Sequence, residues 1–226
     1  MLLVMDKYVS ARALELRNRI LDMGYPCAVS FYPYATDHLR PVLCILTFQD
    51  AIDIIRSSPL DDIPALVLGS GFINSLFQAE QFPTEDAMLA RMEEILFAYL
   101  GTEKRIYAGT PVYYLKKGFS VNELQIFYRM TCLKLTEREQ RILKLILYAP
   151  EEIHSFRRIE AYTFPYPYAE NILNVTNTIS VQISSINRKA ARYTARKFLK
   201  YRREGNREGY VLEIRKIEKK TDCEQK

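Results

Sequence analysis

The chain has 226 residues, which is enough for one large domain or two of ordinary size. Its 48% hydrophobic and 26% charged residues are ordinary for a globular protein with a buried core, and no apolar run approaches the roughly 18 residues of a membrane span. Residues 1–103 hold 7 Lys and Arg against 14 Asp and Glu, whereas residues 104–226 hold 25 against 13. An acidic half followed by a basic half indicates two domains, of which the second has the charge expected of a polyanion-binding protein.

The residues that usually mark enzymes, metal sites or secretion are missing from the sequence. The four cysteines are far apart and form no zinc-ligand spacing: Cys27, Cys44, Cys132 and Cys223. We interpret them as free thiols in a reducing compartment. The sequence has two histidines, no glycine-rich phosphate loop and no nucleophile elbow. We therefore expect no enzymatic activity, no metal and no cofactor. The N-terminus has no secretory pattern, so we expect a cytoplasmic location and no membrane partner.

The first half alternates short strands with helices. Short apolar runs typical of buried strands lie at residues 2–5, 27–31, 42–47 and 65–68. Amphipathic helices are predicted at residues 7–23, 49–57 and 84–100. One more strand is expected near residues 72–77, and Gly101 is close to the predicted boundary. This alternation predicts an α/β domain with a parallel sheet and helices on its faces.

The second half begins with strands and continues with helices. Residues 106–135 contain β-rich runs separated by polar or glycine turns, as in an antiparallel meander. Thr136 and Glu139 have the spacing of a capping box, and Pro150 ends the helix that they begin. Ser155 is expected to cap a second, shorter helix.

A third helix and a hairpin complete this half. The helix is predicted over residues 177–193, and strands near residues 197–202 and 210–214 flank a glycine-containing loop. Three helices followed by a β-hairpin is the plan of a winged helix-turn-helix domain.

Three motifs resemble the winged-helix domain of the OmpR/PhoB family of response regulators. T-I-S-V-Q-I-S-S-I-N-R-K at residues 178–189 resembles that family's recognition helix. L-T-E-R-E at residues 135–139 resembles the start of its first helix, and E-G-Y-V-L at residues 208–212 resembles its closing wing strand. The resemblance implies a two-component-type transcription regulator that binds double-stranded DNA, forms a homodimer and contacts RNA polymerase.

The predicted recognition helix has an apolar and a polar stripe. The apolar stripe, which we expect to pack on the first two helices, consists of Ile179, Ile183, Ile186 and Ala190. The polar side chains that we expect to contact DNA are Thr178, Gln182, Ser185, Asn187, Arg188, Lys189 and Arg192. The amides of Gln182 and Asn187 suit adenine, whereas the basic side chains suit phosphates. The hairpin adds candidate phosphate or minor-groove contacts, with a solvated charged loop as the alternative, at Arg202, Arg203 and Arg207.

The first half resembles the receiver domain of the same family, but its phosphorylation site is degenerate. L-L-V-M-D resembles the first strand, and F-Q-A-E-Q-F-P-T-E-D resembles the stretch around the fifth strand. The resemblance puts Met5 and Asp6 at the acidic pair that holds Mg²⁺, Thr47 at the phosphoacceptor aspartate and Glu80 at the phosphate-binding lysine. Gly69 occupies the position of the threonine that follows the fourth strand. Because most of the required groups are absent, we expect no aspartyl phosphorylation.

The sequence thus predicts a receiver-like, flavodoxin-like domain over residues 1–103 and an OmpR-type winged-helix domain over residues 104–226, the latter beginning with a small antiparallel sheet. The predicted function is that of a sequence-specific transcription regulator that acts without aspartyl phosphorylation. Two alternatives stay open. Phosphorylation could occur at a non-standard aspartate, Asp50 or Asp53, or the winged helix could serve only for protein contacts.

Overall fold

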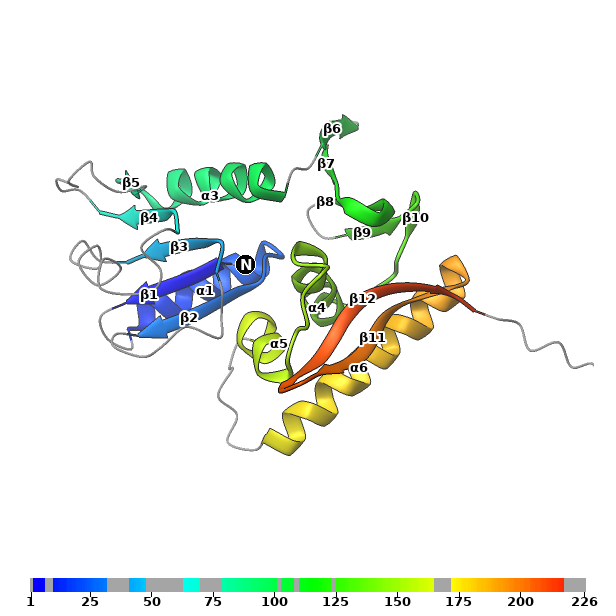
Figure 1. Ribbon diagram of the computed structural model, residues 1–226. Coiled ribbons are helices and arrows are strands. Elements are labelled where there is room, and N and C mark those ends of the chain that lie inside the picture. The colour runs from blue at the N-terminus through cyan, green and yellow to red at the C-terminus, as the bar shows by residue number, and fades with distance from the viewer. Residues whose placement is uncertain are drawn as a thin grey trace, which may run out of the picture.

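The computed structural model contains two sheets, followed by three helices and a hairpin (Figure 1). The described residues are 2–6, 10–31, 41–47, 63–69, 79–100, 103–107, 110–122, 125–164 and 172–217.

The N-terminal sheet is parallel and has five strands. These are β1 (Leu2–Asp6), β2 (Cys27–Phe31), β3 (Leu43–Leu46), β4 (Ala65–Leu68) and β5 (Ala79–Phe82). Their order is β2-β1-β3-β4-β5, and every neighbouring pair is parallel. This is the strand order of flavodoxin-like folds, so the predicted fold class of the first half is confirmed. The strand predicted near residues 72–77 and the helix predicted at residues 49–57 fall outside the described residues.

Two helices pack on one face of this sheet. They are α1 (Ala11–Asp22) and α3 (Glu85–Leu100). Helix α1 starts later than predicted, because the Ser10 side chain accepts a hydrogen bond from the backbone N of Ala13 at 3.0 Å and so caps the helix. Leu16 and Ile20 of α1 and Met92 of α3 belong to a buried cluster with the strand residues on this face.

An antiparallel meander follows, as predicted. It consists of β6 (Glu103–Tyr107), β7 (Thr110–Tyr114), β8 (Phe119–Asn122), β9 (Gln125–Tyr128) and β10 (Thr131–Cys132). A short 3₁₀ turn, η1 (Lys116–Gly118), joins β7 to β8. The order β10-β9-β8-β7-β6 is that of sequential neighbours. The predicted division between residues 103 and 104 falls inside β6, one residue after the strand begins.

The winged helix-turn-helix domain has the predicted elements. They are α4 (Glu137–Tyr148), α5 (Phe156–Thr163), α6 (Ile172–Thr194), β11 (Arg196–Glu204) and β12 (Arg207–Lys216). Both expected N-caps form: Thr136 and Glu139 make the capping box of α4, and Ser155 accepts from Arg158 N. Helix α6 starts five residues earlier than predicted, and both hairpin strands are longer than predicted.

The predicted apolar stripe of α6 is buried. Ile179, Ile183, Ile186 and Ala190 belong to one hydrophobic cluster with α4 and α5. The hairpin crosses the segment before α5, where His154 and Tyr210 exchange two backbone hydrogen bonds of 2.9 Å. A Cβ atom at Gly209 would lie 2.1 Å from the carbonyl oxygen of His154, so this close crossing requires glycine.

The winged helix covers the second face of the N-terminal sheet. Figure 1 shows α5 beside β2, and the two elements are in contact. The shared hydrophobic cluster contains Leu3, Cys44, Leu46 and Val67 of the sheet together with Ile142, Ile146 and Tyr162 of α4 and α5. In the described part of the chain, every helix is too short or too polar to cross a membrane.

Candidate nucleic-acid interface

Helix α6 exposes a row of side chains opposite its buried stripe. The row, here called the outward row, consists of Asn177, Val181, Ser184, Arg188 and Arg192. Val181 is 63% exposed. In Figure 1, α6 lies along the lower edge of the molecule with the hairpin beside it. The outward row is therefore the part of α6 that a large partner can reach.

The predicted polar stripe lies a quarter of a turn away from this row. Successive residues of an α-helix are about 100° apart, so a stripe one residue away from the buried stripe lies on the flank of the helix. Of the predicted polar side chains, Arg188 and Arg192 are exposed. The others are half-buried: Thr178, Gln182, Ser185, Asn187 and Lys189. Asn177, Val181 and Ser184 were not among the predicted side chains, although helical geometry alone places them opposite the buried stripe.

Lys189 and Ser185 point toward α4. The Lys189 ammonium is 2.6 Å from the carboxylate of Glu139, whose side chain is almost completely buried. The same carboxylate accepts from the backbone N of Thr136 at 2.6 Å. Burial acts to raise the pKa of Glu139, but the hydrogen bonds from Lys189, Ser185 and Thr136 outweigh it and hold that pKa below its ordinary value. Lys189 therefore stabilises the α4–α6 contact and has a carboxylate partner already.

Asn187 supports the hairpin. Its amide oxygen accepts from the backbone N of Phe198 at 3.0 Å and of Leu199 at 2.9 Å, and its amide nitrogen donates to Leu199 O at 2.8 Å. An adenine contact needs the same donor and acceptor groups. The structure gives Asn187 a supporting role, and we do not include it in the candidate interface.

Gln182 faces the N-terminal domain. It lines a cavity of about 680 Å³ that Asn18 and Asp22 of α1 line from the other side, with Arg138 of α4 and Thr163 of α5 between them. In this arrangement the N-terminal domain lies beside the side chain that the sequence suggested as an adenine reader.

The hairpin carries the remaining predicted cations. Arg202, Arg203 and Arg207 are all exposed. Arg202 has a carboxylate partner, because its guanidinium is 3.4 Å from Glu204. Within the described residues, Arg203 and Arg207 form no ion pair, although Glu208 and Glu204 stand opposite them in the hairpin register. These two guanidinium groups are available to an external anion.

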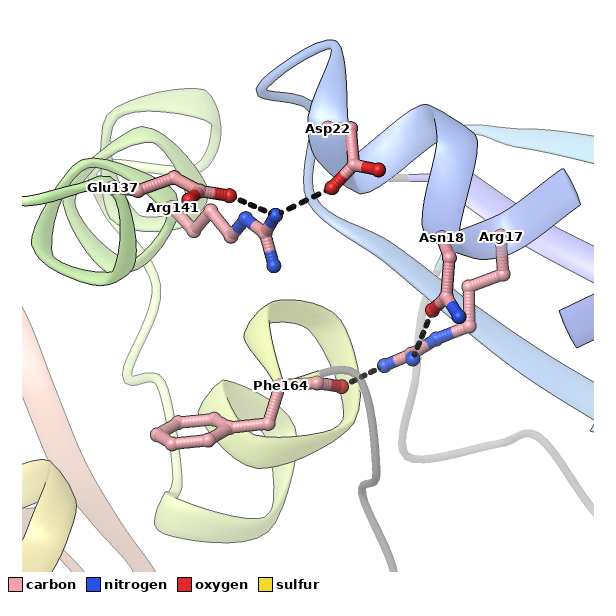
Figure 2. Close-up of polar contacts among 6 residues, drawn as sticks. All are labelled: Arg17, Asn18, Asp22, Glu137, Arg141 and Phe164. Carbon is pink, nitrogen blue, oxygen red and sulfur yellow. Dashed lines mark hydrogen bonds and ion pairs between the residues drawn. The ribbon is translucent and has the colours of Figure 1, made fainter. Parts of the chain in front are cut away.

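Two buried or nearly buried arginines hold the two domains together (Figure 2). Arg17 of α1 is fully buried and donates to the carbonyls of Ala161, at 3.0 Å, and of Phe164 at the end of α5. Arg141 of α4 is 2.9 Å from the carboxylate of Asp22 at the end of α1. A cation at the carboxyl end of a helix is also favoured by the helix dipole, so Arg17 stabilises the end of α5 and the domain contact together.

The strand ends that carry the phosphorylation site in receivers are occupied by internal contacts. Ser10 donates to the carboxylate of Asp6, and Thr47 Oγ1 donates to Met5 O at 3.3 Å. Glu80, which was predicted at the position of the phosphate-binding lysine, does not lie at a strand end: it is the second residue of β5 and pairs with Leu66 within β4. There Arg91 forms a two-point contact with Glu80, with N–O distances of 2.7 and 2.8 Å. The hydrogen bond from Arg91 lowers the pKa of Glu80, which favours its negative charge. Asp50 and Asp53 lie outside the described residues.

Among the residues that the structure describes, no group of three or more His, Cys, Asp or Glu side chains could hold a metal ion.

Figure 1 shows how the second sheet and the three helices follow the flavodoxin-like domain. The chain thus has a response-regulator-like architecture, in which a flavodoxin-like domain precedes a winged helix.

No family model and no curated protein matches the sequence. Among solved structures, one match is described as a member of a novel family of streptococcal redox sensors that evolved from two-component response regulators. It is 14% identical, covers 94% of this chain and 99% of that chain, and has a TM-score of 0.36. Two cysteine variants of RitR also match at 14% identity over 94% of this chain and 98% of theirs, with TM-scores of 0.34 and 0.33. At this level of similarity, the fold assignment depends on the strand order and helices described above.

Proposed function

We propose that the chain is a sequence-specific DNA-binding transcription regulator of the OmpR/PhoB type, and that it acts without aspartyl phosphorylation. The observation that carries the proposal is a set of exposed cations on one domain. They lie on α6 and the adjoining hairpin and comprise Arg188, Arg192, Lys197, Arg202, Arg203 and Arg207.

These cations suit a duplex because helix and hairpin can contact it together. The major groove of B-DNA is wide enough for an α-helix, so the outward row of α6 is the surface that would meet base edges. Arg188 and Arg192 would then lie near phosphates at the groove edge, and the hairpin arginines would contact the neighbouring backbone or minor groove. Phosphate contacts set orientation and affinity, whereas the central side chains of the row give sequence preference.

The internal contacts at the strand ends support the second part of the proposal. A phosphoaspartate switch needs an acceptor, a metal cradle and a cation for the phosphate. By the resemblance Thr47 stands at the acceptor position, and its hydroxyl donates to Met5 O. Thr47 has no carboxylate that could take the phosphoryl group as an acyl phosphate.

The test is the salt dependence of DNA binding by the full chain. Six phosphate contacts should make log K fall with log salt at a slope of about −5. Arg203→Ala and Arg207→Ala should each reduce the slope by about 1, because each removes one unpaired cation. Arg19→Ala is the matched control, since it removes one exposed arginine from the N-terminal domain. It should leave the slope unchanged.

A slope near zero, or equal effects of all three variants, would contradict the proposal. The first result would favour a winged helix used for protein contacts. The second would indicate a response to total charge with no defined DNA-binding surface.

We propose a homodimer as the DNA-binding form, with α3 as the candidate contact and RNA polymerase as a further partner. Helix α3 exposes Ala90, Glu94, Ala98 and Tyr99 on the side away from the sheet, and Tyr99 is 63% exposed. Tyr99→Glu should lower the dimer fraction in light scattering. A monomeric wild-type chain that binds a single half-site with full affinity would overturn the dimer.

A further inference from the structure

We infer that Val181 is a specificity-determining residue that contacts the 5-methyl group of a thymine, so that the half-site contains an A·T pair at the centre of the α6 contact. This inference rests on the proposed DNA-binding function. It concerns how that surface chooses its sequence.

The position of Val181 carries the inference. A single exposed apolar side chain is ordinary on a protein surface. Val181, however, lies in the outward row with Asn177 one turn before it and Ser184 and Arg188 one and two turns after it. Because β-branched residues are modest helix formers, an exposed valine gives α6 no stability of its own. Its apolar surface is useful only when a partner covers it.

Several other side chains of α6 are engaged inside the chain and are not available for base contacts. Asn187 and Lys189, which could contact bases or phosphates, are bound to the hairpin and to Glu139. Gln182 lines the cavity beside α1. The side chains that remain at the centre of the outward row are Val181 and Ser184.

The chemistry of the groove matches these two side chains. The thymine methyl is the only apolar group that a base pair presents in the major groove, and apolar side chains recognise it by contact. Ser184 is small, so the helix can approach the bases closely next to Val181. Asn177, one turn earlier, has the amide geometry that pairs with adenine. The exposed cations on both sides hold an anionic duplex against this row.

The experiment compares thymine with uracil, which lacks only the 5-methyl group. A binding site is first selected with the full chain, and each thymine of that duplex is then replaced singly by deoxyuridine. We expect one replacement per half-site to weaken binding by the wild-type chain about 3- to 5-fold, the effect of one buried methyl group. Val181→Ser should bind the thymine and uracil duplexes equally.

Two further variants serve as controls. Val181→Thr retains a methyl group and should retain sensitivity to uracil. Met130→Asn removes a 76%-exposed apolar side chain at the β9–β10 turn, away from α6, and should behave as wild type. Since Val181 and Met130 are exposed, both substitutions should leave the fold intact.

The outcomes separate this inference from the proposed function. If the wild-type chain binds duplex DNA with a steep salt slope but no uracil position matters, the Val181 contact is wrong and DNA binding stands. The same conclusion follows if Val181→Ser keeps its sensitivity to uracil. If the chain retains no duplex at all, the proposed function fails and the contact fails with it.

Discussion

The strand ends of the N-terminal sheet and the outward row of α6 differ in how their polar groups are used. At the strand ends, Asp6 and Thr47 each make a contact inside the chain. On α6, Ser184 and Arg188 are exposed. Among the described residues, neither has a hydrogen-bond partner or an ion pair.

This difference indicates where an external ligand can bind. A side chain with an internal partner must lose that partner before it can bind anything else, whereas an exposed cation only exchanges water and counterions. The exposed surface of α6 depends on the hairpin beside the helix and on the contact between the two domains. Each can be disrupted separately.

The largest expected effect is that of Gly209→Ala. The new Cβ atom would lie 2.1 Å from His154 O, which is a backbone atom and cannot move aside without shifting the hairpin. We expect the free energy of unfolding to fall by about 3 kcal/mol, together with loss of DNA binding. Chemical denaturation measures the first and a titration with duplex the second. Gly205→Asn is the control, because φ at Gly205 is +57° with nothing within 4 Å, and asparagine tolerates this conformation. Equal stabilities would mean that the hairpin does not cross His154 this closely.

The contact between the domains is tested by Arg17→Met. This change leaves the carbonyls of Ala161 and Phe164 without their charged donor at the end of α5. We expect the free energy of unfolding to fall by about 2 to 3 kcal/mol, or the unfolding transition to separate into two. Arg19→Met is the matched control two residues away, since its ion pairs are exposed and should contribute little. If both variants unfold like the wild type, Arg17 does not hold the domains together.

The sequence predicted the helices and strands better than it predicted which side chains are exposed on them. Strand order and helix caps follow from local patterns, such as the capping box of Thr136 and Glu139 and the four-residue apolar stripe on α6. The sequence placed the exposed polar surface of α6 on the flank of the helix, because the sequence does not distinguish a polar residue that faces water from one that faces α4 or the hairpin. The role of Asn187 depends on the position of β11, which no local pattern specifies.

The contact between the domains also could not be predicted from the sequence. In the sequence, Arg17 is a charged residue of an amphipathic helix, and such a residue is expected to be exposed. Its hydrogen-bond acceptors lie 144 and 147 residues further along the chain. Only the docking of α5 on β2 brings them together. The sequence placed Asp6 and Thr47 at the ends of β1 and β3, where the structure has them, but it misplaced Glu80, which lies within β5.

The pH dependence of stability should show the burial of His154. Burial, assisted by the charge of Arg158, lowers the pKa of His154 to about 4 from an ordinary value of 6.5. Between these values the unfolded chain binds a proton that the folded chain does not, so stability falls as pH falls through this window. The loss should be about 2 kcal/mol between pH 7 and pH 5. His154→Gln, which can still donate to Ala149 O, should flatten the profile. An unchanged slope in that variant would assign the effect to other groups.

The smallest expected effect is that of a phosphoryl analogue on the strand ends. Beryllofluoride with Mg²⁺ should leave oligomeric state and DNA affinity unchanged, and acetyl phosphate should add no mass, because Thr47 cannot form an acyl phosphate. A receiver with an intact acceptor aspartate is the positive control. A stoichiometric, hydroxylamine-labile mass gain with tighter DNA binding would contradict the proposal. Substituting Asp6, Asp50 and Asp53 singly by Asn would then identify the acceptor, and the contrast between the strand ends and α6 would no longer hold.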